Sequence, residues 1–140
     1  MELNEEQIKT ADGIVTGAPV EPETMEQVLA LVVSAAREKF AEDIRVIDVT
    51  EYVDYIDFVV VCSGQTGIQN RAIVDRIIDV LKRYDIILSS LQGYRLADWI
   101  LIDFDAFVVH VFLPEAREFY HLEDIYSGGE EVELPDNAGL

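Results

Sequence analysis

Two runs of apolar residues, many of them β-branched, dominate the C-terminal half of the chain. They occupy residues 97–103 and 107–113, and the short segment Phe104-Asp105-Ala106 separates them. β-branched and aromatic residues favour strands, and an aspartate between two such runs favours a turn. The pattern therefore predicts a β-hairpin. Pro114 follows it and predicts the start of a helix, because proline suits a first helical turn.

The spacing of apolar residues predicts the remaining elements. Apolar residues three and four positions apart indicate a helix over about 25–41, which Thr24 and Gln27 can begin as a capping box. The same spacing indicates a second helix between the break at 63–67 and Tyr84. Other predicted elements are strands over 44–49, 58–62 and 86–88 and a last helix from 114 to about 125, in which Phe119 and Leu122 face the core. Residues 58–62 are apolar throughout, which predicts a central strand buried on both faces.

These elements follow one another in the order α, β, β, α, β, β, β, α. This order predicts an α/β protein in which helices pack on a mixed five-stranded sheet. Composition divides the chain into a flexible N-terminal arm over 1–23, which has a short helix near 4–11, a folded domain over 24–126 and an acidic disordered tail over 127–140.

The charge balance narrows the choice of partner. The chain of 140 residues has 28 acidic and 10 basic residues, a net charge of −18. Such a surface repels phosphate backbones, so direct binding to nucleic acid is not expected, whereas a basic protein partner suits it. Charge that serves only solubility is the simpler interpretation. A single cysteine, Cys62, an acidic N-terminus and the absence of a long apolar run predict a soluble cytoplasmic protein without a membrane span.

The sequence offers little support for catalysis. Ser63 and Gly64 follow a predicted strand and precede a helix, a place where phosphates bind, but no lysine of a P-loop follows them. Asp98 and Asp103 are an odd number of residues apart and point to opposite faces of their strand, and Asp105 lies at the turn. We therefore expect ordinary turn and strand-end aspartates, with no catalytic residue, metal site or cofactor.

Two residues of the hairpin are unusual for a plain core. Trp99 is the only tryptophan, and it serves either as a core aromatic or as the anchor of an exposed patch that Tyr94, Leu96 and Phe104 extend. His110 lies in an apolar strand and shares a face with Val108 and Phe112. No nucleophile accompanies it, so a hydrogen-bonded structural histidine is the favoured interpretation.

Beyond the hairpin, Arg117 is interpreted either as the partner of a strand-end aspartate or as a solvated side chain.

Several motifs occur together in a defined order and spacing. They are Gln92-Gly93, Ala97-Asp98-Trp99-Ile100-Leu101-Ile102-Asp103, Val108-Val109-His110-Val111-Phe112 and Glu115-Ala116-Arg117-Glu118-Phe119-Tyr120-His121-Leu122-Glu123, preceded by Asp57-Phe58-Val59-Val60-Val61-Cys62-Ser63-Gly64. From 24 to about 126 the chain thereby resembles the ribosomal silencing factor family, also called RsfS or Iojap. It departs from the family at Gln92, where glutamate is usual, at Asp105-Ala106, where the family has a Gly-Asp turn, and at 65–69, which lack an arginine.

The resemblance implies a fold related to nucleotidyltransferases but without their metal-binding carboxylates. It implies a non-enzymatic protein that binds the large ribosomal subunit through large-subunit ribosomal protein fourteen. By blocking the small subunit sterically, such a protein silences translation during starvation, and a role in subunit assembly is also consistent with the family. Trp99 matches the family's interface tryptophan. The partner-binding residues expected on this basis are Trp99, Tyr94, Leu96, Asp98, Phe104, His110, Arg117 and Tyr120.

Two alternatives stay open at this stage. One is a divergent nucleotidyltransferase-like enzyme that uses Ser63, Gly64, Asp103 and a divalent ion. The other is an assembly factor or a homodimer off the ribosome, in which the face of Trp99 binds a second copy of the chain.

Overall fold

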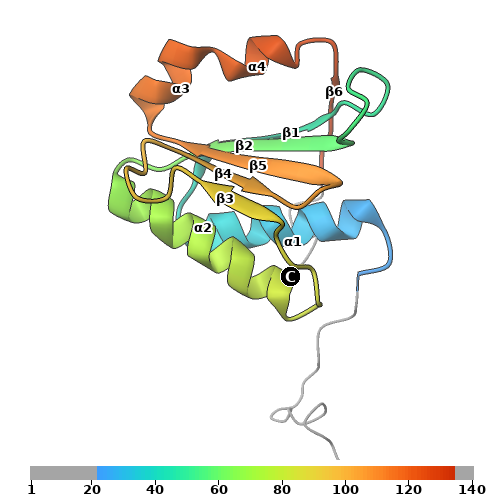
Figure 1. Ribbon diagram of the computed structural model, residues 1–140, viewed down its shortest axis with the longest axis horizontal. Coiled ribbons are helices and arrows are strands. Elements are labelled where there is room, and N and C mark those ends of the chain that lie inside the picture. The colour runs from blue at the N-terminus through green and yellow to red at the C-terminus, as the bar shows by residue number, and fades with distance from the viewer. Residues whose placement is uncertain (1–21, 135–140) are drawn as a thin grey trace, which may run out of the picture.

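A mixed sheet lies between two layers of helices in the computed structural model, which describes residues 22–134 (Figure 1). In chain order the elements are α1 (Met25–Glu38), β1 (Glu42–Asp48), β2 (Phe58–Ser63), α2 (Gly67–Lys82), β3 (Ser90–Gln92), β4 (Trp99–Asp103), β5 (Phe107–Phe112), α3 (Pro114–Tyr120), α4 (Leu122–Ile125) and β6 (Glu130–Glu131). The predicted α/β class and element order are confirmed. The sheet has a sixth strand, β6, that the sequence pattern did not indicate.

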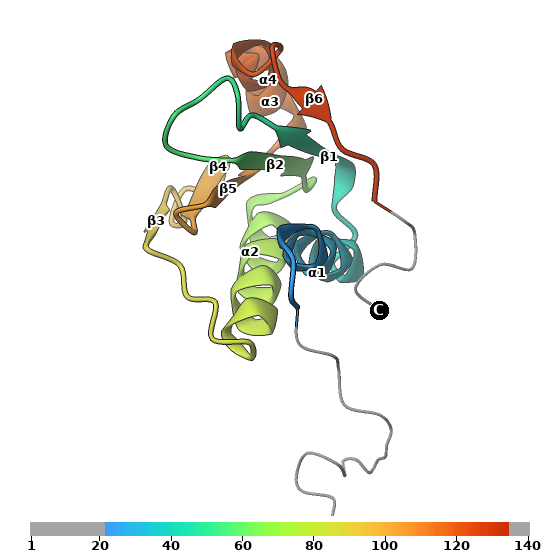
Figure 2. The same cartoon turned by 90° about the vertical axis from the view of Figure 1, so that its right-hand side faces the viewer.

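The strands are arranged in the order β3-β4-β5-β2-β1-β6. The two central strands, β2 and β5, are parallel, and every other neighbouring pair is antiparallel. Helices α1 and α2 cover one face of the sheet, and α3 and α4 lie over the other (Figures 1 and 2). This arrangement gives the protein two apolar cores, one on each side of the sheet.

The central strand β2 shows why both faces are buried. Val60 and Cys62 point toward α1 and α2, whereas Val59 and Val61 belong to the core under α4. Burial raises the pKa of the Cys62 thiol to about 12, so this cysteine stays protonated and inert. The continuous apolar run therefore forms the doubly buried strand that was predicted.

The hairpin between β4 and β5 turns at the expected place. Asp105 has a positive φ of 74°, and its backbone N–H donates a hydrogen bond of 2.8 Å to the Asp103 carboxylate. Aspartate tolerates this left-handed backbone better than most residues, and the carboxylate of Asp103 stabilises the turn. The turn fixes the register, which places Trp99 opposite Phe112 and Leu101 opposite His110.

The short strand predicted at 86–88 is in the wrong place. Pairing with β4 begins only at Ser89, whose N–H donates to the carbonyl of Asp103 over 2.7 Å, and β3 follows at Ser90–Gln92. Ile86 and Leu88 instead pack their side chains against the core beside α2. Their apolar character reflects this packing and not a ladder of strand hydrogen bonds.

The last predicted helix is broken in two. His121 has φ 51° and ψ 42°, which ends α3 and lets α4 begin in a new direction. Leu122 is buried as predicted, but the expectation that Phe119 faces the core is wrong, because its side chain is 77% exposed. The left-handed residue between them breaks the helical spacing that would place both on one face.

Ordered structure continues past Tyr126, where the sequence placed the start of a disordered tail. Tyr126 is followed by a turn and by β6, which pairs with β1, and the N–H of Val132 donates to the carbonyl of Val46 over 2.8 Å. Most of the predicted arm, with its short helix near 4–11, and the end of the predicted tail lie outside the described residues. Among residues 22–134, no helix has the length and apolar character required to cross a membrane.

Candidate functional site

Three aromatic side chains and a histidine meet where β4 begins and β5 ends. Trp99 stacks on Phe112, its partner across the strands, with ring centroids 4.9 Å apart and an interplanar angle of 27°. The ring centroid of Tyr120, at the end of α3, lies 4.8 Å from that of the indole, and the ring centroid of His110 lies 6.0 Å from it. We call these four residues the Trp99 cluster. It joins two strands and a helix, with Phe112 and His110 buried beneath the partly exposed Trp99 and Tyr120.

His110 holds the indole from within the cluster. The indole Nε1–H donates a hydrogen bond of 3.0 Å to His110 Nδ1. The histidine is only 5% exposed, and burial lowers its pKa to about 4, so the ring is neutral near pH 7. A neutral ring is required here, because a protonated Nδ1 could not accept the bond. The structure thus has the hydrogen-bonded strand histidine that was favoured.

Trp99 itself is neither sealed inside nor fully exposed. It is partly buried against the core that contains Phe112. Around it, Tyr120 is 49% exposed and Leu96, in the loop before β4, is 82% exposed. A partly covered aromatic ring with exposed apolar neighbours is typical of an interface anchor.

The other predicted partner-binding residues are distributed unequally. Asp98 is exposed beside Trp99, and its backbone carbonyl accepts a 2.9 Å bond from Leu113 N–H. Tyr94 donates its hydroxyl to the Asp75 carboxylate at 2.9 Å, a bond that raises the pKa of the tyrosine. Phe104 does not join the patch, because it is buried against Phe107 at the other end of the hairpin.

A buried amide that sequence reasoning missed supports the backbone just before Trp99. Ala97 is fully buried and has a positive φ of 63°. The side-chain amide of Asn70 in α2 donates a 2.8 Å hydrogen bond to its carbonyl. This bond fixes a backbone conformation that alanine rarely adopts. The available signal was a single asparagine on the otherwise apolar face of the helix.

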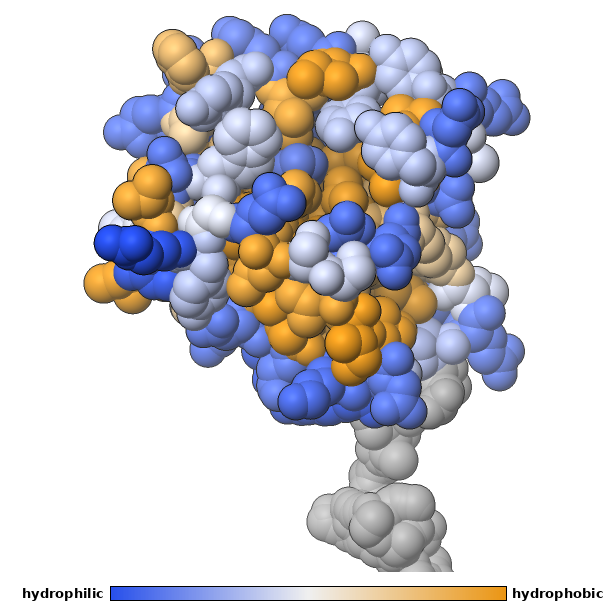
Figure 3. All heavy atoms as spheres, in the orientation of Figure 1, coloured by the Kyte–Doolittle hydropathy of each residue, from blue (hydrophilic) through white to orange (hydrophobic). Residues whose placement is uncertain are grey.

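A second apolar region lies along the β3 edge of the sheet. In Figure 3, apolar side chains gather over the middle of the molecule, where this edge faces the viewer, and hydrophilic residues lie around and below them. Ile87, just before β3, and Leu91, within it, are exposed. Apolar surface is therefore not confined to the Trp99 cluster.

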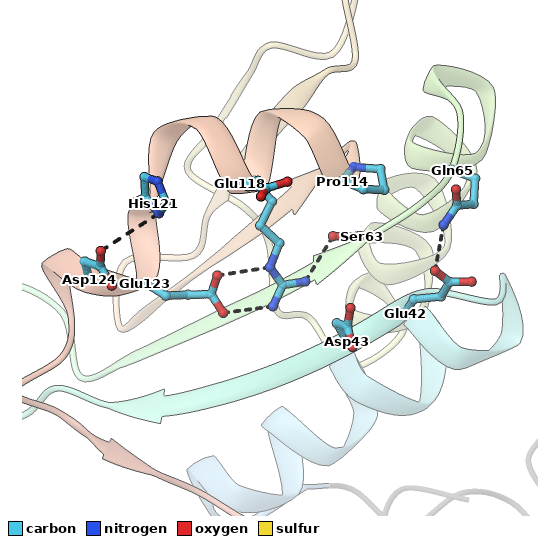
Figure 4. A pocket seen from close by; sticks show the side chains of 10 residues that line it. Glu42, Asp43, Ser63, Gln65, Pro114, Glu118, His121, Glu123 and Asp124 are labelled. Atoms are coloured by element: carbon cyan, nitrogen blue, oxygen red, sulfur yellow. Dashed lines mark hydrogen bonds and ion pairs between the residues drawn. The ribbon is translucent and has the colours of Figure 1, made fainter.

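Arg117 connects α3 to the rest of the fold through charged groups. Its Nε and Nη2 donate to the two carboxylate oxygens of Glu123 at 3.0 and 2.9 Å, and its Nη1 donates to Ser63 Oγ at 3.0 Å (Figure 4). Arg45 in β1 donates to the same carboxylate at 2.7 Å. The partner of Arg117 is thus Glu123 and not the strand-end aspartate that was one of the two interpretations. These bonds hold α3 and α4 against the sheet and so fix Tyr120 beside Trp99.

Arg117 and Glu123 border a pocket of about 310 Å³ at the end of β2. Its lining is mostly acidic and polar and consists of Glu42, Asp43, Ser63, Gln65, Pro114, Arg117, Glu118, His121, Glu123 and Asp124 (Figure 4). The guanidinium of Arg117 is already satisfied within the protein. Across residues 22–134, no three His, Cys, Asp or Glu side chains are grouped so that they could hold a metal ion.

Replacing Arg117 with methionine tests the charged connection. We expect the free energy of unfolding to fall by about 1–2 kcal/mol, because Glu123 keeps Arg45 but loses its bidentate partner. Urea unfolding at pH 7 measures this change in the free energy of unfolding. Arg83→Met is the control, since within residues 22–134 that exposed arginine pairs only with Asp79, one helical turn away, and its loss should cost about 0.5 kcal/mol or less. Equal losses in the two variants would contradict the role given to Arg117.

The strand register decides against the enzyme alternative. Ser63 pairs with Phe112, which pairs with Trp99, whereas Asp103 pairs with Val108 at the opposite end of β4. Asp103 also uses its carboxylate to cap the hairpin turn. Ser63, Gly64 and Asp103 therefore cannot form one active site.

Comparison with known proteins identifies the family. The family model described as "Ribosomal silencing factor during starvation" matches residues 22–139. The chain belongs to the RsfS family. Members of this family are non-enzymatic factors that bind the large ribosomal subunit, and the resemblance seen in the sequence is confirmed.

The relatives span bacteria and organelles. The chain is 33% identical to ribosomal silencing factor RsfS of Halalkalibacterium halodurans, over 78% of this chain and 93% of that protein. It is 35% identical to the maize protein named "Protein Iojap, chloroplastic", over 72% of this chain and 44% of that protein. A crystal structure of a protein from Bacillus halodurans, at 33% identity, matches with a TM-score of 0.70 over 78% of this chain and 99% of that chain. The RsfS fold thus extends across the described domain.

Proposed function

We propose that this RsfS family member binds the large ribosomal subunit through large-subunit ribosomal protein fourteen and blocks the small subunit from joining, which represses translation in the cytoplasm. The observation that carries the proposal is the Trp99 cluster. It presents the only tryptophan of the chain, partly exposed, on a support built from two strands and a helix.

In this proposal Trp99 is the central contact, and Leu96, Asp98 and Tyr120 surround it. Tyr94 lies at the edge, where its hydroxyl is held by Asp75. The central apolar contact excludes water, and the surrounding polar groups set orientation. His110, Phe104 and most of Arg117 are covered by the protein itself, so we assign them no direct contact with the partner.

The net charge supports a basic protein as the immediate partner. A chain with 28 acidic and 10 basic residues is repelled by the phosphates of ribosomal RNA, and a basic protein surface attracts it. Binding to a basic ribosomal protein at the subunit-joining face avoids the repulsion by RNA and uses the attraction to a basic surface. We expect the association rate to fall as salt increases, because screening weakens the long-range attraction.

Subunit joining measured by sucrose-gradient sedimentation tests the function. Large subunits incubated first with the protein should form fewer joined ribosomes when small subunits are added, and the protein should sediment with the free large subunits. A steric mechanism requires that order of addition matters, so ribosomes joined beforehand should be affected more slowly. Normal joining by large subunits that carry the protein would contradict the blocking mechanism and favour a role in subunit assembly.

A further inference from the structure

We propose that His110 is a positioning residue for partner binding: by accepting the indole N–H of Trp99 it fixes the orientation in which the indole meets the partner. The inference deepens the proposed function, because its consequence for affinity rests on Trp99 being the contact. The hydrogen bond itself can be tested without the ribosome.

The strand register places the two rings so that the bond can form. Trp99 pairs with Phe112 and Leu101 pairs with His110, so tryptophan and histidine are diagonal neighbours on one face of the sheet. Phe112 supports the indole by stacking, but stacking alone permits the ring to slide or turn. The bond of 3.0 Å to His110 Nδ1 supplies the missing direction. Within residues 22–134, the indole N–H has no other hydrogen-bond acceptor.

The position of the proton on the His110 ring indicates the role of this residue. Because Nδ1 accepts, the proton of the neutral ring lies on Nε2. Nε2 is buried and has no hydrogen-bond partner in the described part of the chain. A buried donor without a partner is destabilising, and the neighbours on the same face, Val108 and Phe112, are apolar. A purely structural role at this position would be met by an apolar side chain, so the bond to Trp99 is the polar function that the histidine retains.

A fixed indole favours binding because less freedom is lost when the partner arrives. Ordering a flexible side chain at an interface reduces affinity, and a ring held in its bound orientation avoids that loss. The net contribution of one such hydrogen bond corresponds to about a threefold to tenfold change in affinity. His110 acts in this way through Trp99, without touching the partner.

Nuclear magnetic resonance of the full, ¹⁵N-labelled chain tests the bond in the natural protein. The single tryptophan gives a single indole N–H signal. We expect a scalar coupling across the hydrogen bond between Trp99 Nε1 and His110 Nδ1, and a histidine whose proton is on Nε2. A ring protonated on Nδ1, or no measurable coupling in a well-resolved spectrum, would overturn the proposal.

Two variants separate the acceptor from the ring. His110→Phe keeps an aromatic ring and loses the acceptor, whereas His110→Asn loses the ring and keeps an acceptor near the position of Nδ1. We expect His110→Phe to bind large subunits about threefold to tenfold more weakly and His110→Asn to recover part of that loss. If His110→Phe fails to fold, the proposal is tested by the Trp99–His110 scalar coupling in the natural chain and by the affinity of His110→Asn for large subunits. Affinity in the folded His110→Phe variant equal to that of the natural chain would overturn the proposal.

A double-mutant cycle distinguishes positioning from general support of the fold. In the Trp99→Ala background, His110→Phe should cause no further loss of affinity, because there is no indole to orient. An equal loss in both backgrounds would assign His110 a structural role only. If Trp99→Ala does not weaken binding at all, the proposed function fails. If Trp99→Ala weakens binding and His110→Phe does not, only the positioning inference fails.

Discussion

Replacing Trp99 with alanine should weaken binding to the large ribosomal subunit about 30-fold or more, while the protein stays folded. Truncation of a central interface tryptophan costs about 2–4 kcal/mol of binding free energy, because it removes a large apolar contact and admits water. The fold should tolerate the change, since Phe112 beneath the indole is anchored in the core by its own burial. The affinity is measured by pelleting a concentration series of the protein with isolated large subunits.

A matched control comes from the opposite end of the sheet. Tyr55, in the connection between β1 and β2, is an aromatic residue that is 82% exposed. The strand register puts this connection near the start of β2, whereas Trp99 is level with the end of β2, on the far side of β5. Tyr55→Ala should therefore bind like the natural chain. An unchanged affinity in Trp99→Ala, or an equal loss in Tyr55→Ala, would refute the proposed contact.

The second large effect is on stability and depends on pH. We expect His110 to make the free energy of unfolding fall by about 3 kcal/mol as the pH is lowered from 6.5 to 4. Burial holds the pKa of the folded histidine at about 4, below the ordinary value of 6.5. In this range the unfolded chain takes up a proton that the folded chain does not, so acid favours unfolding. Above pH 6.5 both states are neutral and the contribution is fully present.

The measurement must separate His110 from the many carboxylates. Chemical unfolding of the natural chain and of His110→Phe is followed at several pH values between 7 and 4. The acidic residues and His121, which is exposed, contribute equally to both proteins and cancel in the difference. We expect the difference in unfolding free energy to change by about 3 kcal/mol across this range. A difference that does not vary with pH would show that the histidine is not held neutral in the folded state.

The elements that sequence patterns predicted correctly are those whose signals are local. The apolar run of β2, the cap at Thr24 and the turn at Asp105 depend on residues adjacent in the chain. The hairpin register then follows from the turn, so the diagonal approach of Trp99 and His110 could have been derived by counting residues outward from Asp105. The family likewise could be predicted, because its motifs lie in that same hairpin and in the helix after it.

Features that depend on distant parts of the chain could not be predicted in this way. The carboxylate of Glu123 accepts hydrogen bonds from Arg117 in α3 and Arg45 in β1, and these residues come together only when the helices pack on the sheet. The break at His121 has no proline or glycine to mark it. The position of Asn70 on the apolar face of α2 indicates a buried amide, but its partner, the carbonyl of Ala97, is set only when the loop before β4 packs on the helix. Each of these outcomes is set by tertiary contacts that override local preference.

The short strand β6 has a consequence for how molecules of this protein meet one another. It covers one end of the outer edge of β1 with Glu130 and Glu131, two residues that carry like charges. An uncovered β-strand edge recruits the same edge of another chain, and acidic side chains along it resist such stacking. A chain cut after Gly129 would leave this edge of β1 uncovered, and we expect it to self-associate into fibres more readily than the full chain.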